Sequence, residues 1–344
     1  MRVTFLLSCL LLLVPFDIWA IQVRLTDATV VLELEINEKV RGLKPEQVPI
    51  LIERAAHLLG SVYQRGGNVP RDDAEAFKWF LFAAEQRHAV AADNLGYMYL
   101  NGTGVTKDYT QAAYWYAIGA AEGYAPAQNN LGQLYEHGLG VQKDYSAALS
   151  LYRQAVERGL ASAQNNLGAM YEAGLGVPKD YKAAVRWYRA SAEQGEPVGQ
   201  SNLAFMYAHG QGLQQDFREA AQWYALAAET GYAPAQGRLA QLYETGHGVR
   251  LDYVMAYSWY ARASSNGHEA SRQGLASLSE RMTSRQMQSA RSRLNRINSE
   301  KDEPSVEWCH CRKEITGTAV VAKIDANCAC CGESVLKFEL AIAV

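Results

Sequence analysis

Five cysteines near the C-terminal end are the side chains of this 344-residue chain with the clearest capacity for chemistry. Cys328 and Cys331, followed by a glycine, form a C-x2-C-G pattern, which is typical of one half of a tetrahedral zinc site. Cys309 and Cys311 would supply the opposite pair across a hairpin, although they lie closer together than in a standard knuckle. The spacing therefore predicts a structural zinc site whose ligands are Cys309, Cys311, Cys328 and Cys331, with Cys330 outside it.

Disulfide bonding is the alternative for the same cysteines in an exported chain, although an odd number of thiols leaves one unpaired. Thiols without any assigned role are the third alternative. Residues 319–324 and 335–344 are expected to form strands between and after the cysteines. A ribbon of roughly forty residues has no hydrophobic core of its own, so either kind of crosslink would be structural before it was catalytic.

Ser334 and Lys337 match the S-x-x-K pattern, in which a lysine helps a serine to attack a lactam. In a strand, however, these two side chains would point to opposite faces, and neither S-D-N nor K-T-G accompanies them. The sequence contains no H-E-x-x-H, G-x-S-x-G, Walker or dinucleotide-binding glycine pattern either. We therefore predict that the chain is not an enzyme and has no certain cofactor.

The middle of the chain repeats with a constant period of 36 residues. The period places tyrosine, glycine, leucine and tryptophan in fixed slots, with Leu151 as the one departure in the tryptophan slot. A period of this length is typical of stacked helical hairpins. The slot that shows it most simply is an aspartate, at Asp72, Asp108, Asp144, Asp180, Asp216 and Asp252.

Each repeat is predicted to form two helices joined by a turn. In the second repeat, the spacing of one buried helix face is shown by Ala91, Leu95, Met98 and Tyr99. The glycines in residues 101–104 would end this helix, and Asp108 would cap the next one, with a capping box to the glutamine three residues on. The second helix is expected to bury Ala112, Trp115, Tyr116 and Ala120.

This pattern resembles the Sel-1-like repeat family, which is close to the tetratricopeptide repeats. The segment NLGYMYLNGTGVTKDYTQAAYWYAIGAAEG and its copies carry the resemblance, over six full units from about residue 55 to residue 268. The resemblance implies a right-handed α/α solenoid of six 36-residue helical hairpins. Thr283 and Gln286 predict a capping box for one further helix, ending near Ile297, that would close the array.

A row of asparagines marks the expected binding surface. The first helix of each hairpin in such a solenoid lines the inner, concave side, and tetratricopeptide relatives use asparagines there to hold a peptide backbone. The alternative is that each asparagine bonds to the adjacent repeat and locks the stack. The slot contains Asn94, Asn130, Asn166, Asn202 and Arg238.

The N-terminal residues resemble an export signal. Arg2 precedes an apolar run that ends at Pro15, too short for the ~20 residues of a membrane-spanning helix. Residues 1–20 are therefore interpreted as a signal peptide, with an uncleaved anchor as the alternative. Alternation in residues 21–36 predicts a β-hairpin within an N-terminal extension that ends at residue 46. The repeat array with its capping helix would span 47–299, and the cysteine-containing β tail 300–344.

Composition limits the remaining classes of function. With 33 basic and 36 acidic residues, the net charge of -3 does not favour a nucleic-acid-binding protein. We expect a periplasmic or secreted adaptor that binds a protein or peptide partner in the concave groove, with no stable membrane insertion after signal cleavage. The alternatives are a lactam-binding protein or hydrolase of the cysteine-rich Sel-1-like type, and a metal or redox sensor acting through the C-terminal cysteines.

Overall fold

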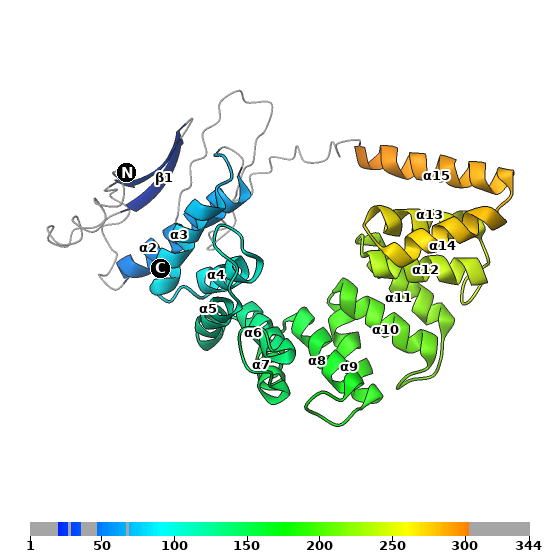
Figure 1. The fold of residues 1–344 in the computed structure, drawn as a ribbon, viewed down its shortest axis with the longest axis horizontal. Coiled ribbons are helices and arrows are strands. Elements are labelled where there is room, and N and C mark those ends of the chain that lie inside the picture. Colours follow the sequence, from blue (N-terminus) through cyan, green and yellow to red (C-terminus); the bar gives the residue numbers. More distant parts are fainter. Residues whose placement is uncertain (1–19, 27–28, 36–46, 67–68, 303–344) are drawn as a thin grey trace, which may run out of the picture. The chain divides into compact units, whose positions relative to one another are not determined.

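The protein is described here by a computed structural model, which places residues 20–26, 29–35, 47–66 and 69–302 (Figure 1). The described residues form an all-helical α/α solenoid of fourteen helices, α2 to α15, preceded by one two-stranded sheet. The predicted signal peptide, the cysteine tail and the Ser334–Lys337 pair lie outside the described residues.

The described chain divides into two compact units. Unit 1 contains the residues up to Ala127 and the turn Leu139–Val141, and unit 2 contains Gln128–Gly138 and the residues from Gln142 onward. Each unit is built from hairpins of the same repeat.

Unit 1 begins with a β-hairpin at the place where alternation predicted one. Strand β1, Ala20–Thr26, pairs antiparallel with β2, Thr29–Glu35, with Thr26 opposite Thr29 at the turn. The helices of this unit are α2 (Gln47–Arg65), α3 (Asp73–Glu85), α4 (Ala89–Asn101) and α5 (Tyr109–Ala121).

Unit 2 continues the same alternation of first and second helices of the repeat. Helix α6 (Ala125–His137) begins at the end of unit 1. The following helices are α7 (Tyr145–Glu157), α8 (Ala161–Ala173), α9 (Tyr181–Glu193), α10 (Pro197–His209), α11 (Phe217–Glu229), α12 (Ala233–Thr245), α13 (Tyr253–Ser265), α14 (Glu269–Arg281) and α15 (Ser284–Asp302).

The repeated aspartate caps the second helix, as predicted. Oδ1 of Asp108 accepts hydrogen bonds from the backbone N–H groups of Thr110 and Gln111, at 2.8 and 3.1 Å. The other half of the predicted capping box is not formed, because the Asp108 N–H donates to the carbonyl of Tyr99 at 2.9 Å. This bond recurs at all six aspartates, so each cap also ties the second helix to the first.

In four hairpins an aromatic ring of the second helix packs against a glycine of the first helix. A Cβ atom at Gly96 of α4 would lie 2.5 Å from the ring of Tyr116 of α5, which is 1% exposed. The predicted buried face is confirmed by Ala91, Leu95 and Met98, which are fully buried, whereas Tyr99 is only partly buried. A methyl group at Gly96 would collide with the ring as the two helices are placed, whereas α10 and α12 have alanine in the same slot. Equivalent contacts join Gly60 to Phe80, Gly132 to Tyr152 and Gly168 to Tyr188.

The array ends with the predicted additional helix. Thr283 and Gln286 form the full capping box, with the Thr283 N–H donating to Oε1 of Gln286 at 2.8 Å and the Gln286 N–H donating to Oγ1 of Thr283 at 3.3 Å. Helix α15 packs on α13 and buries Ala290 completely. It continues to Asp302, beyond the end expected near Ile297, since no glycine or proline stops it earlier.

Candidate functional site: the helix-A face

The predicted site residues lie on the first helices of successive repeats, and the side of these helices that carries them is called the helix-A face. The four asparagines are partly buried and the arginine is exposed. Each precedes a buried leucine, which fixes the side of the helix from which the polar residue projects. Unit 1 contains Asn94 on α4, and unit 2 contains Asn130 on α6, Asn166 on α8, Asn202 on α10 and Arg238 on α12.

In unit 2 the asparagines form a continuous chain of hydrogen bonds. Nδ2 of Asn202 donates to Oδ1 of Asn165 at 2.8 Å, and Nδ2 of Asn165 donates to Oδ1 of its neighbour Asn166 at 3.4 Å. Nδ2 of Asn166 then donates to Oδ1 of Asn129 at 2.8 Å. The acceptors Asn129 and Asn165 are 5% and 8% exposed, so the chain links three repeats from inside the stack.

These bonds hold the amides in place and still leave part of their capacity for a partner. A primary amide has two N–H donors and an oxygen that can accept two hydrogen bonds. Asn202 uses one donor and Asn166 uses one donor and one acceptor site in the bonds described. Both residues are partly exposed, so a partner could reach part of each side chain.

The amide chain stops at the repeat that contains α12. Serine occupies position 201, where an asparagine acceptor would be needed, and Arg238 replaces the donor. The guanidinium of Arg238 donates instead to Oε1 of Gln241, one turn along the same helix, at 3.1 Å. Within the described residues Arg238 makes no ion pair with a carboxylate. A cation on the helix-A face therefore follows the row of neutral amides.

In unit 1 a histidine takes the place of the buried asparagine. Nδ2 of Asn94 lies 3.3 Å from Nε2 of His57, and the ring of His57 stacks on His88 with centroids 4.7 Å apart. Burial, followed by the neighbouring His88, lowers the pKa of His57 to about 4. Burial also lowers the pKa of His88, whose Nδ1 accepts the Ala91 N–H at the start of α4.

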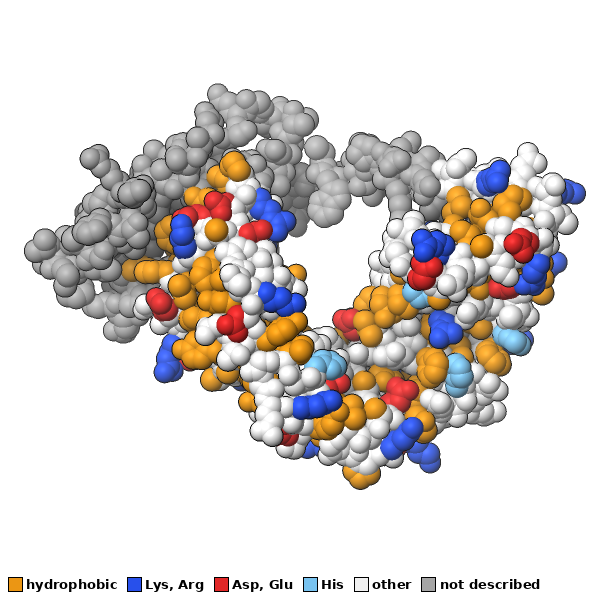
Figure 2. All heavy atoms as spheres, in the orientation of Figure 1, with side chains coloured by type: hydrophobic (Ala, Val, Ile, Leu, Met, Phe, Trp, Pro, Cys, Tyr) orange, Lys and Arg blue, Asp and Glu red, His pale blue; other side chains and the backbone are white. Residues whose placement is uncertain are grey.

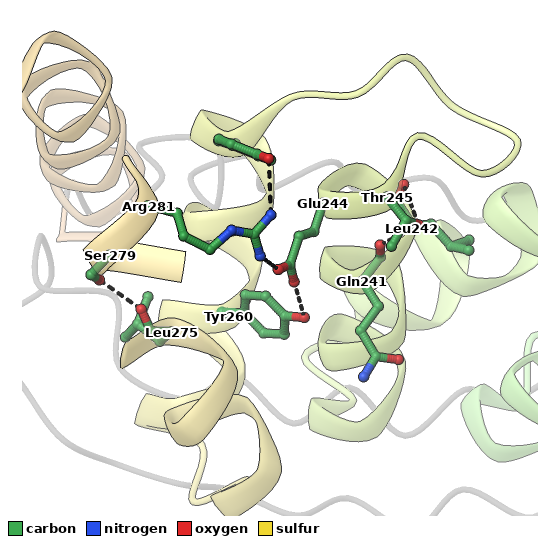
Figure 3. A network of polar contacts seen from close by, with 9 residues as sticks. Gln241, Leu242, Glu244, Thr245, Tyr260, Leu275, Ser279 and Arg281 are labelled. Carbon is green, nitrogen blue, oxygen red and sulfur yellow. Dashed lines mark hydrogen bonds and ion pairs between the residues drawn. The ribbon is translucent and has the colours of Figure 1, made fainter. Parts of the chain in front are cut away.

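Three repeats of unit 2 contain a second polar link, from a buried tyrosine to a glutamate. Figure 3 shows Glu244 of α12 between Tyr260 and Arg281. The Tyr260 hydroxyl donates to Glu244 at 2.8 Å, and Arg281 pairs with the other carboxylate oxygen. Burial, helped by the bond to Glu244, raises the pKa of Tyr260 well above its usual range, so this group does not titrate near neutral pH. The same bond joins Tyr152 to Glu136 and Tyr188 to Glu172.

The distribution of charged and metal-binding side chains indicates no second candidate site among the described residues. The face drawn in Figure 2 mixes lysine and arginine with aspartate and glutamate. In the same part of the chain, no three histidine, cysteine or acidic side chains are grouped to hold a metal ion. No helix there is long and apolar enough to cross a membrane. The predicted zinc ligands are among the residues that are not described.

Sequence reasoning identified the outer asparagines and missed their buried partners. The signal was present as the Asn-Asn pairs at 129–130 and 165–166, in which only the second residue was assigned to the site. Tyr152 and Glu136, 16 positions apart, were also missed. Two repeats keep the tyrosine but have Leu100 or Ala208 in the glutamate slot, so the hairpin forms without this bond.

Comparison with protein families decides the identity of the repeat. The model of the Sel1 repeat matches six consecutive segments, 53–88, 89–124, 125–160, 161–196, 197–232 and 233–268. The chain belongs to the Sel1-repeat family. Sel1-repeat proteins are generally non-catalytic scaffolds for protein–protein interaction.

Three solved structures that are similar to this chain include two described as Sel1-repeat or SLR proteins. A Sel1 repeat protein from Oxalobacter formigenes is 32% identical over 64% of this chain and 86% of that chain, with a TM-score of 0.56. A protective antigen of uropathogenic Escherichia coli strains with an SLR fold is 27% identical over 78% of this chain and 74% of that chain, with a TM-score of 0.42. An immunity protein from Pseudomonas aeruginosa is 25% identical over 53% of this chain and 67% of that chain, with a TM-score of 0.42. A comparison with curated proteins gives no match.

Proposed function

We propose that this Sel1-repeat protein is a non-catalytic adaptor that binds an extended segment of a protein partner along the helix-A face of unit 2. The observation that carries the proposal is the hydrogen-bonded row of amides from Asn129 to Asn202. Fixed amides lose little conformational entropy when they bind, which favours weak but repeated contacts to a peptide backbone.

The row suits recognition of main chain rather than of particular side chains. Repeats place a partly exposed amide at Asn130, Asn166 and Asn202, and each such group both donates and accepts. An extended peptide offers the complementary N–H and C=O groups whatever its sequence. Specificity for one partner would then come from side-chain contacts at the ends of the row.

We place this adaptor in the bacterial cell envelope, in the periplasm or beyond. Support comes from the sequence: residues 1–20 have the positive start, short apolar run and Ile-Trp-Ala ending of a secretory signal, so the mature chain would begin at Ile21. The balanced charge supports a protein or peptide partner and not a nucleic acid.

The experiment compares partner binding by two matched double variants of the full chain. Asn166→Ala with Asn202→Ala removes the exposed amides of the row. Lys182→Ala with Gln222→Ala removes two exposed side chains from the second helices α9 and α11 of the same unit. Each protein is used to capture partners from the native envelope fraction, and the captured proteins are quantified by mass spectrometry.

We expect the asparagine variant to lose the partners that the wild type captures, and the control variant to keep them. Circular dichroism must show equal helical content in both. Full retention of the wild-type partners by the folded asparagine variant would overturn the proposal. In a separate measurement, the mass of the native protein purified from its own cells shows whether its mature chain begins at Ile21.

A further inference from the structure

A small cavity opens beside Arg238, where the row of amides ends. It measures about 170 Å³, whereas one water molecule needs roughly 10–15 Å³. The cavity is formed within unit 2 by α12, by α13 and by the start of α14. Its lining includes Arg238, Gln241, Tyr260, His268 and Ser271.

The repeat departs from its own pattern beside this cavity. Glycine occupies position 237, the slot that contains a buried asparagine in α6 and α8. A Cβ atom at Gly237 would lie 2.5 Å from Oγ of Ser271 and 3.1 Å from the ring of His268. The missing side chain therefore allows the N-terminus of α14 to approach α12 closely.

The side chains that line the cavity include one cation, Arg238, and no carboxylate. The Arg238 guanidinium donates a hydrogen bond to the neutral Gln241, and its charge lowers the pKa of Tyr260 against the dominant effect of burial. The backbone N–H groups at the start of α14 point toward its N-terminal end, where the helix dipole is positive. His268 is held by Ser271, with Nδ1 and Oγ 2.7 Å apart.

The nearby carboxylates are already paired. Glu244 on α12 accepts hydrogen bonds from Tyr260 and Arg281, and Arg281 also bonds to the Tyr253 hydroxyl. Glu269 in the first turn of α14 forms an ion pair with Arg272. Arg238 is thus left as a cation without a carboxylate partner in the part of the chain that the structure describes.

We propose that this cavity binds the carboxylate of an aspartate or glutamate side chain in the peptide segment held by the amide row. The inference rests on the proposed function and adds the chemistry of the partner to it. Position 274 on α14, one period after Arg238, is a glycine whose Cβ atom would lie 2.8 Å from the ring of Tyr260, so the row of polar side chains ends at Arg238. The inference concerns a side-chain carboxylate, and a free C-terminal carboxylate is a separate outcome of the test.

The test is a selection of peptides from a random twelve-residue display library on the full-length protein. Binders are synthesised with an amidated C-terminus, as the selected sequence and with its acidic residue changed to glutamine or asparagine. Their affinities are measured for the wild type and for Arg238→Asn, which introduces the asparagine that occupies this slot in the other repeats. The control is Arg218→Gln on the second helix α11.

We expect selected peptides to share an acidic residue at one position. Loss of that acid, or Arg238→Asn, should weaken binding by about tenfold, since charge-assisted hydrogen bonds have this magnitude. The two changes together should weaken binding no further than either alone. Arg218→Gln should bind like the wild type.

Two results would overturn the inference and leave the proposed function standing. One is a set of peptides that need Asn166 and Asn202 but have no preferred acidic position, or that bind Arg238→Asn unchanged. The other is a carboxylate requirement met only by a free C-terminus. Peptides that bind equally well to the Asn166→Ala, Asn202→Ala variant, or the absence of any binders, would contradict the proposed function as well.

Discussion

His57 shows how a single replacement in a repeated slot gives unit 1 a dependence on pH. The pKa of His57 is lowered to about 4 in the folded chain, whereas a histidine in an unfolded chain titrates near 6.5. The unfolded state therefore binds a proton first as the pH decreases. The free energy of unfolding has its full value above about pH 6.5 and falls as the pH is lowered toward 4.

We predict that lowering the pH from 7 to 5 weakens the protection of the α4 amides against hydrogen exchange, after correction for the intrinsic rates. His57→Asn, which places the same residue type as Asn165 beside Asn94, should remove much of this pH effect. The exposed His137→Asn, at the end of α6, should leave it unchanged. An equal pH effect in the wild type and in His57→Asn would contradict this account.

At the residue scale the sequence predicted the positions that repeat and missed those that depart from the repeat. The cap at Asp108 and the buried Leu95 could be predicted because each follows from local spacing. Bonds such as Asn202 to Asn165 could not, since they join residues 37 positions apart and depend on how the repeats are stacked. The cavity at Arg238 depends on the same stacking together with one glycine.

At the element scale, glycines in the turns set how closely one hairpin approaches the next. The second loop glycine of a repeat lies against the start of the second helix of the preceding repeat. Gly212 has a φ of +73°, and a Cβ atom there would lie 2.3 Å from the carbonyl oxygen of Tyr181. Gly231, which follows α11, has a φ of +94°. A Cβ atom at this position would have no atom of another residue within 4 Å.

We predict that Gly212→Ala lowers the free energy of unfolding more than Gly231→Ala. Both substitutions place an alanine in a left-handed backbone conformation, which lowers the free energy of unfolding by roughly 1–2 kcal/mol. Gly212→Ala should cost about 1–3 kcal/mol more, because its methyl group would collide with the backbone of the neighbouring repeat. Urea unfolding of the two variants measures the difference, and equal losses would show that the close contact does not matter.

The elements themselves were largely predictable, for a physical reason. Each hairpin is defined by signals within one 36-residue period, namely an apolar stripe, a loop glycine and a capping aspartate. The errors concerned helix ends. Helix α15 extends to Asp302 because no glycine or proline stops it earlier, and the Asp108 N–H donates to the carbonyl of Tyr99 rather than to the predicted glutamine side chain.

At the scale of the whole molecule, the division into two compact units near Ala127 and Gln128 has no counterpart in the repeat pattern. The period continues unchanged across this point, so the sequence indicates only one array. The row of amides and the cavity both lie in unit 2. We therefore expect the partner to bind to the surface of unit 2.

Site-specific photo-crosslinking in living cells tests this assignment most directly. A photoreactive amino acid is placed at Gln241 on the helix-A face of α12, or at Gln222 on the second helix α11; both native side chains are exposed. The account predicts that the partner is crosslinked from position 241 and not from position 222. Crosslinking of the same partner from position 222 but not from position 241 would contradict it.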